Sequence, residues 1–128
     1  MNKVIVRNQD EDYKVVNVGN EIELEFMQDV VQGYIERIAY VKELEQRNID
    51  MWINEEGKLI EGLKPTFIAI QKDTGKILDV IMGNVLFTSH DGEGGTVALN
   101  DVQMQYIKSK LKTVAVLNDG SIVNVIEV

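Results

Sequence analysis

Runs rich in β-branched and aromatic residues recur along the chain, and short polar turns separate them. This pattern is typical of a protein built largely from strands. Three turns, at 54–58, 72–76 and 118–121, place a glycine behind Asn or Asp, and such a glycine accepts the positive φ of a hairpin turn. We expect a C-terminal β-hairpin from Thr113–Leu117 and Ile122–Ile126. The other expected strands are Val4–Arg7, Tyr13–Val18, Tyr34–Val41, Ile49–Asn54, Phe67–Gln71 and Ile77–Thr88.

A helix is predicted over about 101–112. Asn100 is a favourable N-cap, and Gln103 completes a capping box with it. Leu99 and Met104 occupy the two positions of a hydrophobic staple, which fixes the angle at which the chain enters the helix. Lysines are concentrated in the last turns, where positive charge interacts favourably with the helix dipole.

A second helix is predicted over about 20–32. Asn20 and Glu23 fit another capping box, and Gly33 fits the position just beyond a helix end. Between 20 and 26, however, apolar residues alternate with glutamates, which is a strand pattern. The pattern therefore leaves open whether residues 20–26 form a helix or a strand.

Together these elements predict an α+β fold with a mostly antiparallel sheet, two helices and a C-terminal β-hairpin. The 128 residues contain no linker, repeat or low-complexity tract, so we expect a single domain over 1–128. Helices are expected to cover one face of the sheet, while the other face meets water or a partner.

Charge and composition restrict the possible functions. The chain has 21 acidic and 13 basic residues and a net charge of −8, which disfavours direct binding to nucleic acid. Acidic residues are concentrated in residues 1–64, and this half would attract a basic partner, imitate nucleic acid, or only keep the protein soluble. Cysteine is absent, and no apolar run has the length of a signal peptide or a membrane span. These features predict a cytoplasmic protein that binds no membrane.

The sequence carries no recognisable catalytic, metal or cofactor motif. His90 is the only histidine, and it lies beside Asp91 in a glycine-rich loop. It is either a general base or ligand contact, or an ordinary exposed loop residue. The loop lacks the phosphate-binding and calcium-binding patterns, so we predict neither a cofactor nor a metal. An enzyme that uses Glu36, or His90 with Asp91, is kept as a third possibility.

Tyr34, Glu36 and Tyr40 share one face of the expected strand, because alternate residues of a strand point the same way. Aromatic and carboxylate groups together suit the stacking and hydrogen bonding of a base or a ribose. An ordinary solvated sheet face is the alternative. Arg37, which would reach a phosphate, points to the opposite side by the same alternation.

Short motifs in the middle of the chain resemble those of one known family. They are V-Q-G-Y-I-E at Val31–Glu36, N-E-E-G-K at Asn54–Lys58, and G-N-V at Gly83–Val85. Leu99–Gln103 matches the family's closing L-T-D-x-Q-type helix. Over about 24–112 the chain thus resembles a small domain family of unknown function found in bacteriophages and mobile elements.

The resemblance implies a phage-like setting, in which small proteins often counteract host defences. We therefore predict a non-enzymatic accessory protein that binds and sequesters a small nucleotide-like signal, acting as a homo-oligomer. The alternative is an acidic inhibitor or DNA mimic that binds a basic host protein through a row of carboxylates at Glu21, Glu23, Glu25 and Asp29. The residues predicted to bind the ligand are Tyr34, Glu36, Arg37, Asn54, Lys58, Asn84, Thr88 and His90.

Overall fold

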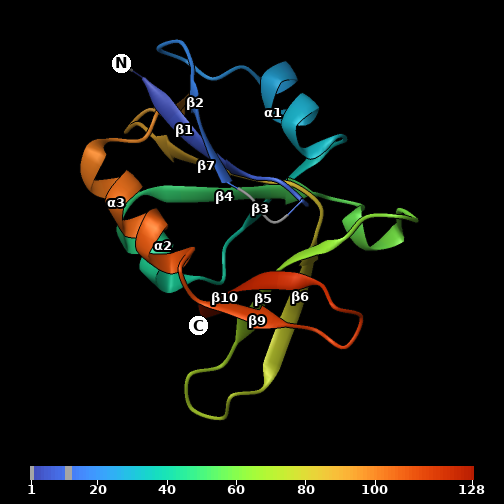
Figure 1. Ribbon diagram of the computed structural model, residues 1–128. Coiled ribbons are helices and arrows are strands. Elements are labelled where there is room, and N and C mark those ends of the chain that lie inside the picture. The colour runs from blue at the N-terminus through green and yellow to red at the C-terminus, as the bar shows by residue number, and fades with distance from the viewer. Residues whose placement is uncertain (1, 11–12) are drawn as a thin grey trace.

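The computed structural model describes residues 2–10 and 13–128, and within these ranges ten strands form two sheets (Figure 1). The first sheet has the strand order β2-β1-β7-β4-β3, and β8 pairs with β7 beside this path. All of its strand pairs are antiparallel. Its strands are β1 (Lys3–Arg7), β2 (Tyr13–Asn17), β3 (Ile35–Ile38), β4 (Ile49–Asn54), β7 (Val85–His90) and β8 (Thr96–Val97).

The second sheet has the strand order β6-β5-β10-β9. Strand β10 lies between β5 and β9, and it pairs parallel with β5 and antiparallel with β9. The predicted C-terminal hairpin is therefore confirmed, and its pairing with β5 joins it to the rest of the sheet. The strands are β5 (Pro65–Ile70), β6 (Ile77–Met82), β9 (Val114–Val116) and β10 (Ile122–Glu127).

One helix covers the outer side of the first sheet, and the other two help to fill the space between the two sheets. Helix α1 lies on the side of the first sheet opposite to the second sheet (Figure 1). Its Met27 joins Val4 and Leu86 of the first sheet in a small core. The helices are α1 (Leu24–Val31), α2 (Lys42–Gln46) and α3 (Asp101–Lys110).

A larger core lies between the two sheets. Met51 and Phe87 come from the first sheet, and Phe67 and Ile81 come from the second. Helices α2 and α3 add further buried side chains to this core. The first sheet is therefore apolar on both faces, because each face packs against a different core. The helices and strands together confirm the predicted α+β class.

The helix predicted over 101–112 is confirmed as α3, which ends at Lys110. Asn100 Oδ1 accepts a hydrogen bond from the Gln103 N–H at 2.8 Å, and Gln103 Oε1 accepts one from the Asn100 N–H at 2.9 Å. The expected capping box is present. The Gln103 side chain also donates to Ser89 Oγ at 3.0 Å, which ties the start of α3 to β7.

The helix predicted over 20–32 is shorter than expected. α1 begins at Leu24, and Glu23 occupies its N-cap without a capping hydrogen bond from the side chain. The capping box expected of Asn20 and Glu23 is therefore wrong, because the Asn20 side chain instead accepts a hydrogen bond from Asn2 at 2.8 Å. At the other end Gln32, with φ 63°, takes the left-handed conformation, and not Gly33, the residue expected to end the helix.

Three other expectations differ from the structure. The expected strand Ile77–Thr88 is two strands, because Gly83 has φ 83° and turns the chain from β6 of the second sheet into β7 of the first. The turn at 54–58 makes no hairpin, since it leads through the 3₁₀ helix η1 (Gly57–Leu59) from β4 to β5, which belong to different sheets. The expected strand 34–41 ends at Ile38 and is followed by α2, a helix too short to show a periodic pattern.

One buried polar contact joins the two sheets directly. Arg7 of β1, 2% exposed, donates from Nε to Asn124 Oδ1 of β10 at 2.8 Å and from Nη2 to the Ile122 carbonyl at 3.0 Å. The Asn124 side-chain amide donates to the Leu111 carbonyl at the end of α3. Buried polar groups need such partners, so these bonds define how the second sheet sits against β1 and α3.

Candidate functional site

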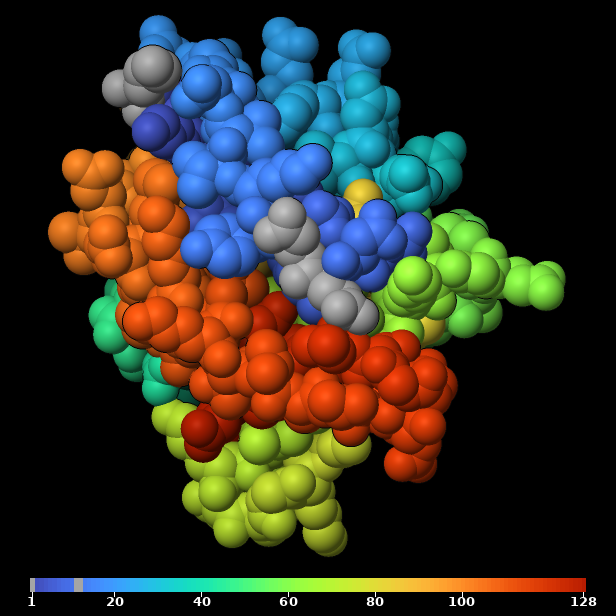
Figure 2. All heavy atoms as spheres, in the orientation of Figure 1, coloured from blue at the N-terminus to red at the C-terminus, as the bar shows by residue number. Residues whose placement is uncertain are grey.

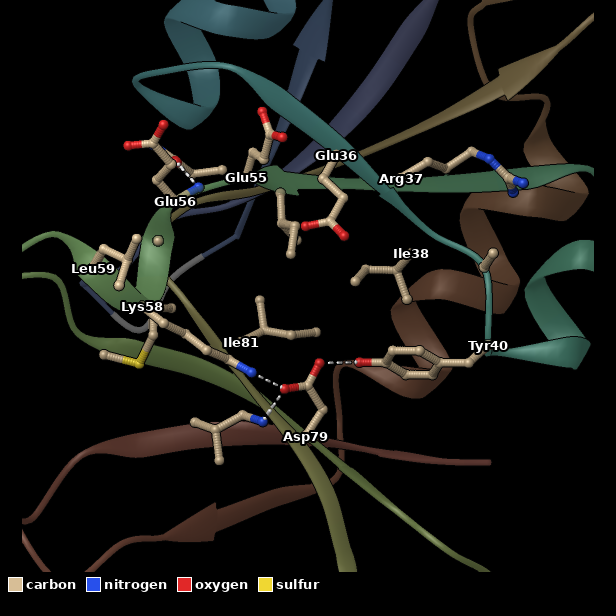
Figure 3. A pocket seen from close by; sticks show the side chains of 16 residues that line it. Glu36, Arg37, Ile38, Tyr40, Glu55, Glu56, Lys58, Leu59, Asp79 and Ile81 are labelled. Atoms are coloured by element: carbon tan, nitrogen blue, oxygen red, sulfur yellow. Dashed lines mark hydrogen bonds and ion pairs between the residues drawn. The ribbon is translucent and has the colours of Figure 1, made fainter.

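A groove of about 560 Å³ opens where edge strands of the two sheets face each other. Residues 36–40, in β3 and just after it, form one wall, and residues 79–82 of β6 form the other. Residues 53–59, at the end of β4 and in η1, line the remaining side (Figure 3). The groove exists because the chain crosses from one sheet to the other after β4, which leaves β3 and β6 as facing edges.

The inner surface of the groove is apolar. Ile38 of β3, Ile53 of β4 and Ile81 of β6 line it. Ile38 and Ile81 also belong to the core between the sheets, so the packing of that core holds this surface in place (Figure 3). Binding sites of this kind combine an apolar surface with a few polar groups that determine which ligand fits.

Carboxylates dominate the polar groups of the groove. Glu36, Glu55, Glu56 and Asp79 line it, and Arg37 and Lys58 are its basic residues. Figure 3 shows the Arg37 side chain directed away from the groove, where it pairs with Glu45 outside it. The cation that enters the groove is that of Lys58, which already pairs with Asp79. The field inside the groove is therefore negative.

Asp79 connects three parts of the groove. Its carboxylate accepts hydrogen bonds from Tyr40 Oη at 2.9 Å, from the Val80 N–H at 2.8 Å, and from Lys58 Nζ. Partial burial raises the pKa of Asp79, but the hydrogen bonds from Lys58 and Tyr40 and the charge of Lys58 outweigh it, so the pKa lies below its usual value. The carboxylate is therefore charged at neutral pH.

Tyr40 is the neutral member of this group. Partial burial raises the pKa of its hydroxyl above the usual value, and the hydrogen bond to Asp79 and the charges of Asp79 and Glu36 raise it further. The hydroxyl therefore keeps its proton at neutral pH and donates it to Asp79 across the groove, from the segment after β3 to β6.

Asn54 holds together the end of β4 and the end of α1. It is buried, and its Nδ2 donates to the carbonyls of Val31 and Gln32 at 3.1 and 3.2 Å. Its Oδ1 accepts from the Glu56 N–H at 2.8 Å, which shapes the turn into η1. Asn54 therefore positions Glu56 at the rim of the groove, and its side-chain polar atoms are occupied by protein partners.

A glycine is required at residue 33 by the close approach of the Asn54 side chain, rather than by backbone conformation. A Cβ atom at residue 33 would lie 2.6 Å from Asn54 Nδ2, a distance at which one of the two residues must move. We expect Gly33→Ala to lower the free energy of unfolding by about 2 kcal/mol, because Asn54 cannot shift without losing its hydrogen bonds. Urea denaturation followed by circular dichroism measures this change.

Gly92→Ala is the matched control for that substitution, because a Cβ atom at residue 92 meets no atom within 4 Å. Its effect should stay within about 0.5 kcal/mol. Equal effects of the two substitutions would show that the Gly33 contact is not responsible.

The groove brings together half of the residues predicted to bind a ligand. Glu36, Arg37, Asn54 and Lys58 line it. Tyr34, which is 68% exposed, lies outside it in a separate hollow at the end of α1. The expected common face of Tyr34, Glu36 and Tyr40 is therefore not formed as a whole: Glu36 and Tyr40 line the groove together, but Tyr34, just before β3, does not.

Asn84 and Thr88 lie away from the groove and hold protein groups in place. Asn84 Nδ2 donates to the Val30 carbonyl of α1 at 2.9 Å, and its Oδ1 accepts from the Gln9 N–H at 3.0 Å. Thr88 is fully buried, and its hydroxyl accepts from Trp52 Nε1 at 2.9 Å. In this structure both side chains join elements of the fold.

His90 is at the end of β7 and is also outside the groove. Its Nδ1 lies 3.1 Å from Oδ2 of Asp50, a buried residue of β4, rather than pairing with the neighbouring Asp91. Asp91 instead accepts hydrogen bonds from the N–H groups of Glu93 and Gly95, which close the glycine-rich loop. These loop hydrogen bonds hold the pKa of Asp91 below its usual value.

Three acidic residues of the groove, Glu55, Glu56 and Asp79, were not among the predicted ligand-binding residues. Of these, Asp79 is the one that joins its walls. It stands in the expected strand 77–88 with no neighbouring motif. Its importance comes from residues 58 and 40, which are distant in sequence and reach it only because the edges of the two sheets face each other. One acidic residue in an otherwise apolar strand, I-L-D-V-I-M, is the single local signal that it offered.

Residues 2–10 and 13–128 also bear on metal binding and on membrane insertion. In these ranges no three His, Cys, Asp or Glu side chains come together as metal ligands would. Likewise, none of the helices in the described part of the chain has both the length and the apolar character needed to cross a membrane.

Comparison with known proteins gives a match to one family model. Neither the curated proteins nor the solved structures contain a significant match to the chain. A family model matches residues 1–112, which include the whole first sheet, the three α-helices and the groove, and leave out the C-terminal hairpin. The chain belongs to the family described as Domain of unknown function (DUF3846).

Proposed function

We propose that the protein is a non-enzymatic binding domain whose groove receives a basic segment of a partner protein. The observation that carries this proposal is the charge of the groove, where four carboxylates line an apolar surface and Lys58 is already paired with Asp79. A cationic ligand would find unpaired carboxylates at Glu36, Glu55 and Glu56, while its aliphatic parts would contact the isoleucines of the inner surface.

Electrostatics of the whole chain support the same class of partner. The net charge of −8 attracts basic surfaces over long distances and speeds the first encounter. The resemblance to a phage and mobile-element family supports placing the basic partner in a host cell, where binding would inhibit it. In this proposal the acidic groove, rather than the row of carboxylates before and on α1, makes the specific contacts.

The test uses a fluorescent synthetic peptide in which lysine alternates with threonine. We expect it to bind at low salt and to be released at about 1 M salt, where the Debye length is about 3 Å. Glu36→Lys should weaken binding roughly tenfold, because it replaces an attraction in the groove with a repulsion. Fluorescence anisotropy measures both effects.

Glu25→Lys is the matched control, because Glu25 is exposed on α1, on the far side of the first sheet. Both substitutions change the net charge from −8 to −6. Equal weakening by the two variants would mean that general charge, and not the groove, attracts the peptide. Absence of binding at low salt would remove the proposal.

Sequestration of a small nucleotide is the second candidate, and the groove volume favours it. About 560 Å³ is within the range of small-ligand sites, and Tyr40 offers an aromatic ring. The phosphates would face the carboxylates, so this candidate predicts the opposite response: Glu36→Lys should strengthen binding. Calorimetry with cyclic dinucleotides and ADP-ribose tests this binding. The mass of the protein in solution tests the proposed homo-oligomer.

A further inference from the structure

One edge of the groove carries backbone groups that have no partner among residues 2–10 and 13–128. The Glu55 N–H donates to the Tyr34 carbonyl at 2.9 Å, so residues 34 and 55 are a hydrogen-bonded pair of the β3–β4 ladder. Hydrogen-bonded pairs alternate in an antiparallel ladder, and Glu36 and Ile38 therefore also bond to β4. The N–H and C=O groups of Ile35 and Arg37 must then point away from β4, to the edge where no described strand pairs.

The facing edge of β6 is protected in a way that β3 is not. The Val80 N–H donates to the carboxylate of Asp79, the residue before it in β6. That carboxylate is held in turn by Tyr40 and Lys58. Charged side chains that cover an edge are a known means of preventing a further strand from pairing there. Of the two edges that line the groove, β3 is thus the open one.

Side chains at the β3 edge leave room for a partner strand. Glu36 and Ile38 point into the groove, because Ile38 is part of the core between the sheets and alternate residues share a face. Arg37 points to the other face and pairs with Glu45, so its long side chain does not cover its own backbone groups (Figure 3).

We propose that the basic segment binds as an additional antiparallel strand on β3. This inference rests on the proposed function and specifies its mode of recognition. The partner forms backbone hydrogen bonds with Ile35 and Arg37, as in other cases of strand addition to an exposed sheet edge. A basic side chain lies directly across from Glu36, and the side chain two residues away contacts the apolar surface at Ile38.

The pairing geometry determines which peptide amides matter. Residues across from Ile35 and Arg37 exchange hydrogen bonds with β3, whereas the residue across from Glu36 directs its N–H away from β3. In the lysine–threonine peptide, lysines face Glu36 and threonines face Ile35 and Arg37. N-methylation of the threonines should therefore weaken binding about tenfold per site, and N-methylation of the lysines should have little effect.

Amide hydrogen exchange of the protein provides a second readout. Saturation with the peptide should slow exchange of the Ile35 and Arg37 amides roughly tenfold or more, because they gain acceptors. The Glu36 amide, which already donates within the β3–β4 ladder, should change little. The alternating protection is a signature that simple charge attraction does not produce.

The outcomes separate this inference from the function on which it rests. If no peptide binds at low salt, both are wrong. If the peptide binds with the Glu36 dependence but N-methylation at threonines and lysines has equal effects, only strand addition is overturned. An effect limited to the lysines would overturn the antiparallel orientation and indicate a parallel strand. Unchanged exchange at Arg37 in the complex would also overturn the inference.

Discussion

Phe67→Ala is expected to lower the free energy of unfolding by about 4 kcal/mol. Phe67 stands in the centre of the second sheet and is fully buried. Its ring meets that of Phe87 of the first sheet edge to face, with centroids 5.9 Å apart and an angle of 73° between the planes. Removing the ring loses this contact and leaves a cavity where the two sheets meet. Urea denaturation followed by circular dichroism measures the change.

Leu59→Ala is a control for loss of an apolar side chain, because Leu59 of η1 is largely exposed. Its effect on the free energy of unfolding should stay within about 0.5 kcal/mol. A loss of less than about 1 kcal/mol for Phe67→Ala would contradict the description of one core shared by the two sheets.

The second large effect is expected at the buried contact between the sheets. Asn124→Ala should lower the free energy of unfolding by about 3 kcal/mol. Arg7 Nε loses the acceptor that Asn124 provides, and the Leu111 carbonyl loses its donor, and both of these hydrogen bonds are buried. Circular dichroism in urea measures this loss as well.

A double-mutant cycle identifies the cause of that loss. If the contact between Arg7 and Asn124 is responsible, the double variant Arg7→Leu/Asn124→Ala should lose less stability than the sum of the losses in Arg7→Leu and Asn124→Ala. Additive losses would show that the two side chains contribute independently, and they would contradict the described link between β1 and β10.

Features that depend on neighbouring residues could be predicted from the sequence. The capping box of Asn100 and Gln103 is an example, since both partners lie within one helical turn. The hairpin around Gly120 is another, because a glycine with φ 87° and its flanking strands are adjacent in the chain. For α1, neighbouring residues were misleading at Asn20, whose side chain finds its partner in Asn2 rather than in the helix.

Features that depend on distant pairings could not be predicted. The pattern indicated a mostly antiparallel sheet but did not show that the strands divide into two sheets, or that β10 pairs parallel with β5. The groove follows from this division. Glu36 and Lys58 were recognised as candidates, while Asp79 was missed, because its partners reach it across the space between the sheets.

The position of β10 also determines when the second sheet can be completed during synthesis of the chain. Residues 122–127 form an inner strand of the second sheet, yet the ribosome makes them after the other described strands. Until they emerge, β5 pairs with β6 but lacks β10. Phe67 is then less buried than it is in the folded protein. Apolar surface exposed during synthesis favours aggregation and chaperone binding. The second sheet, and with it one wall of the groove, therefore reaches its final form only after β10 has been made.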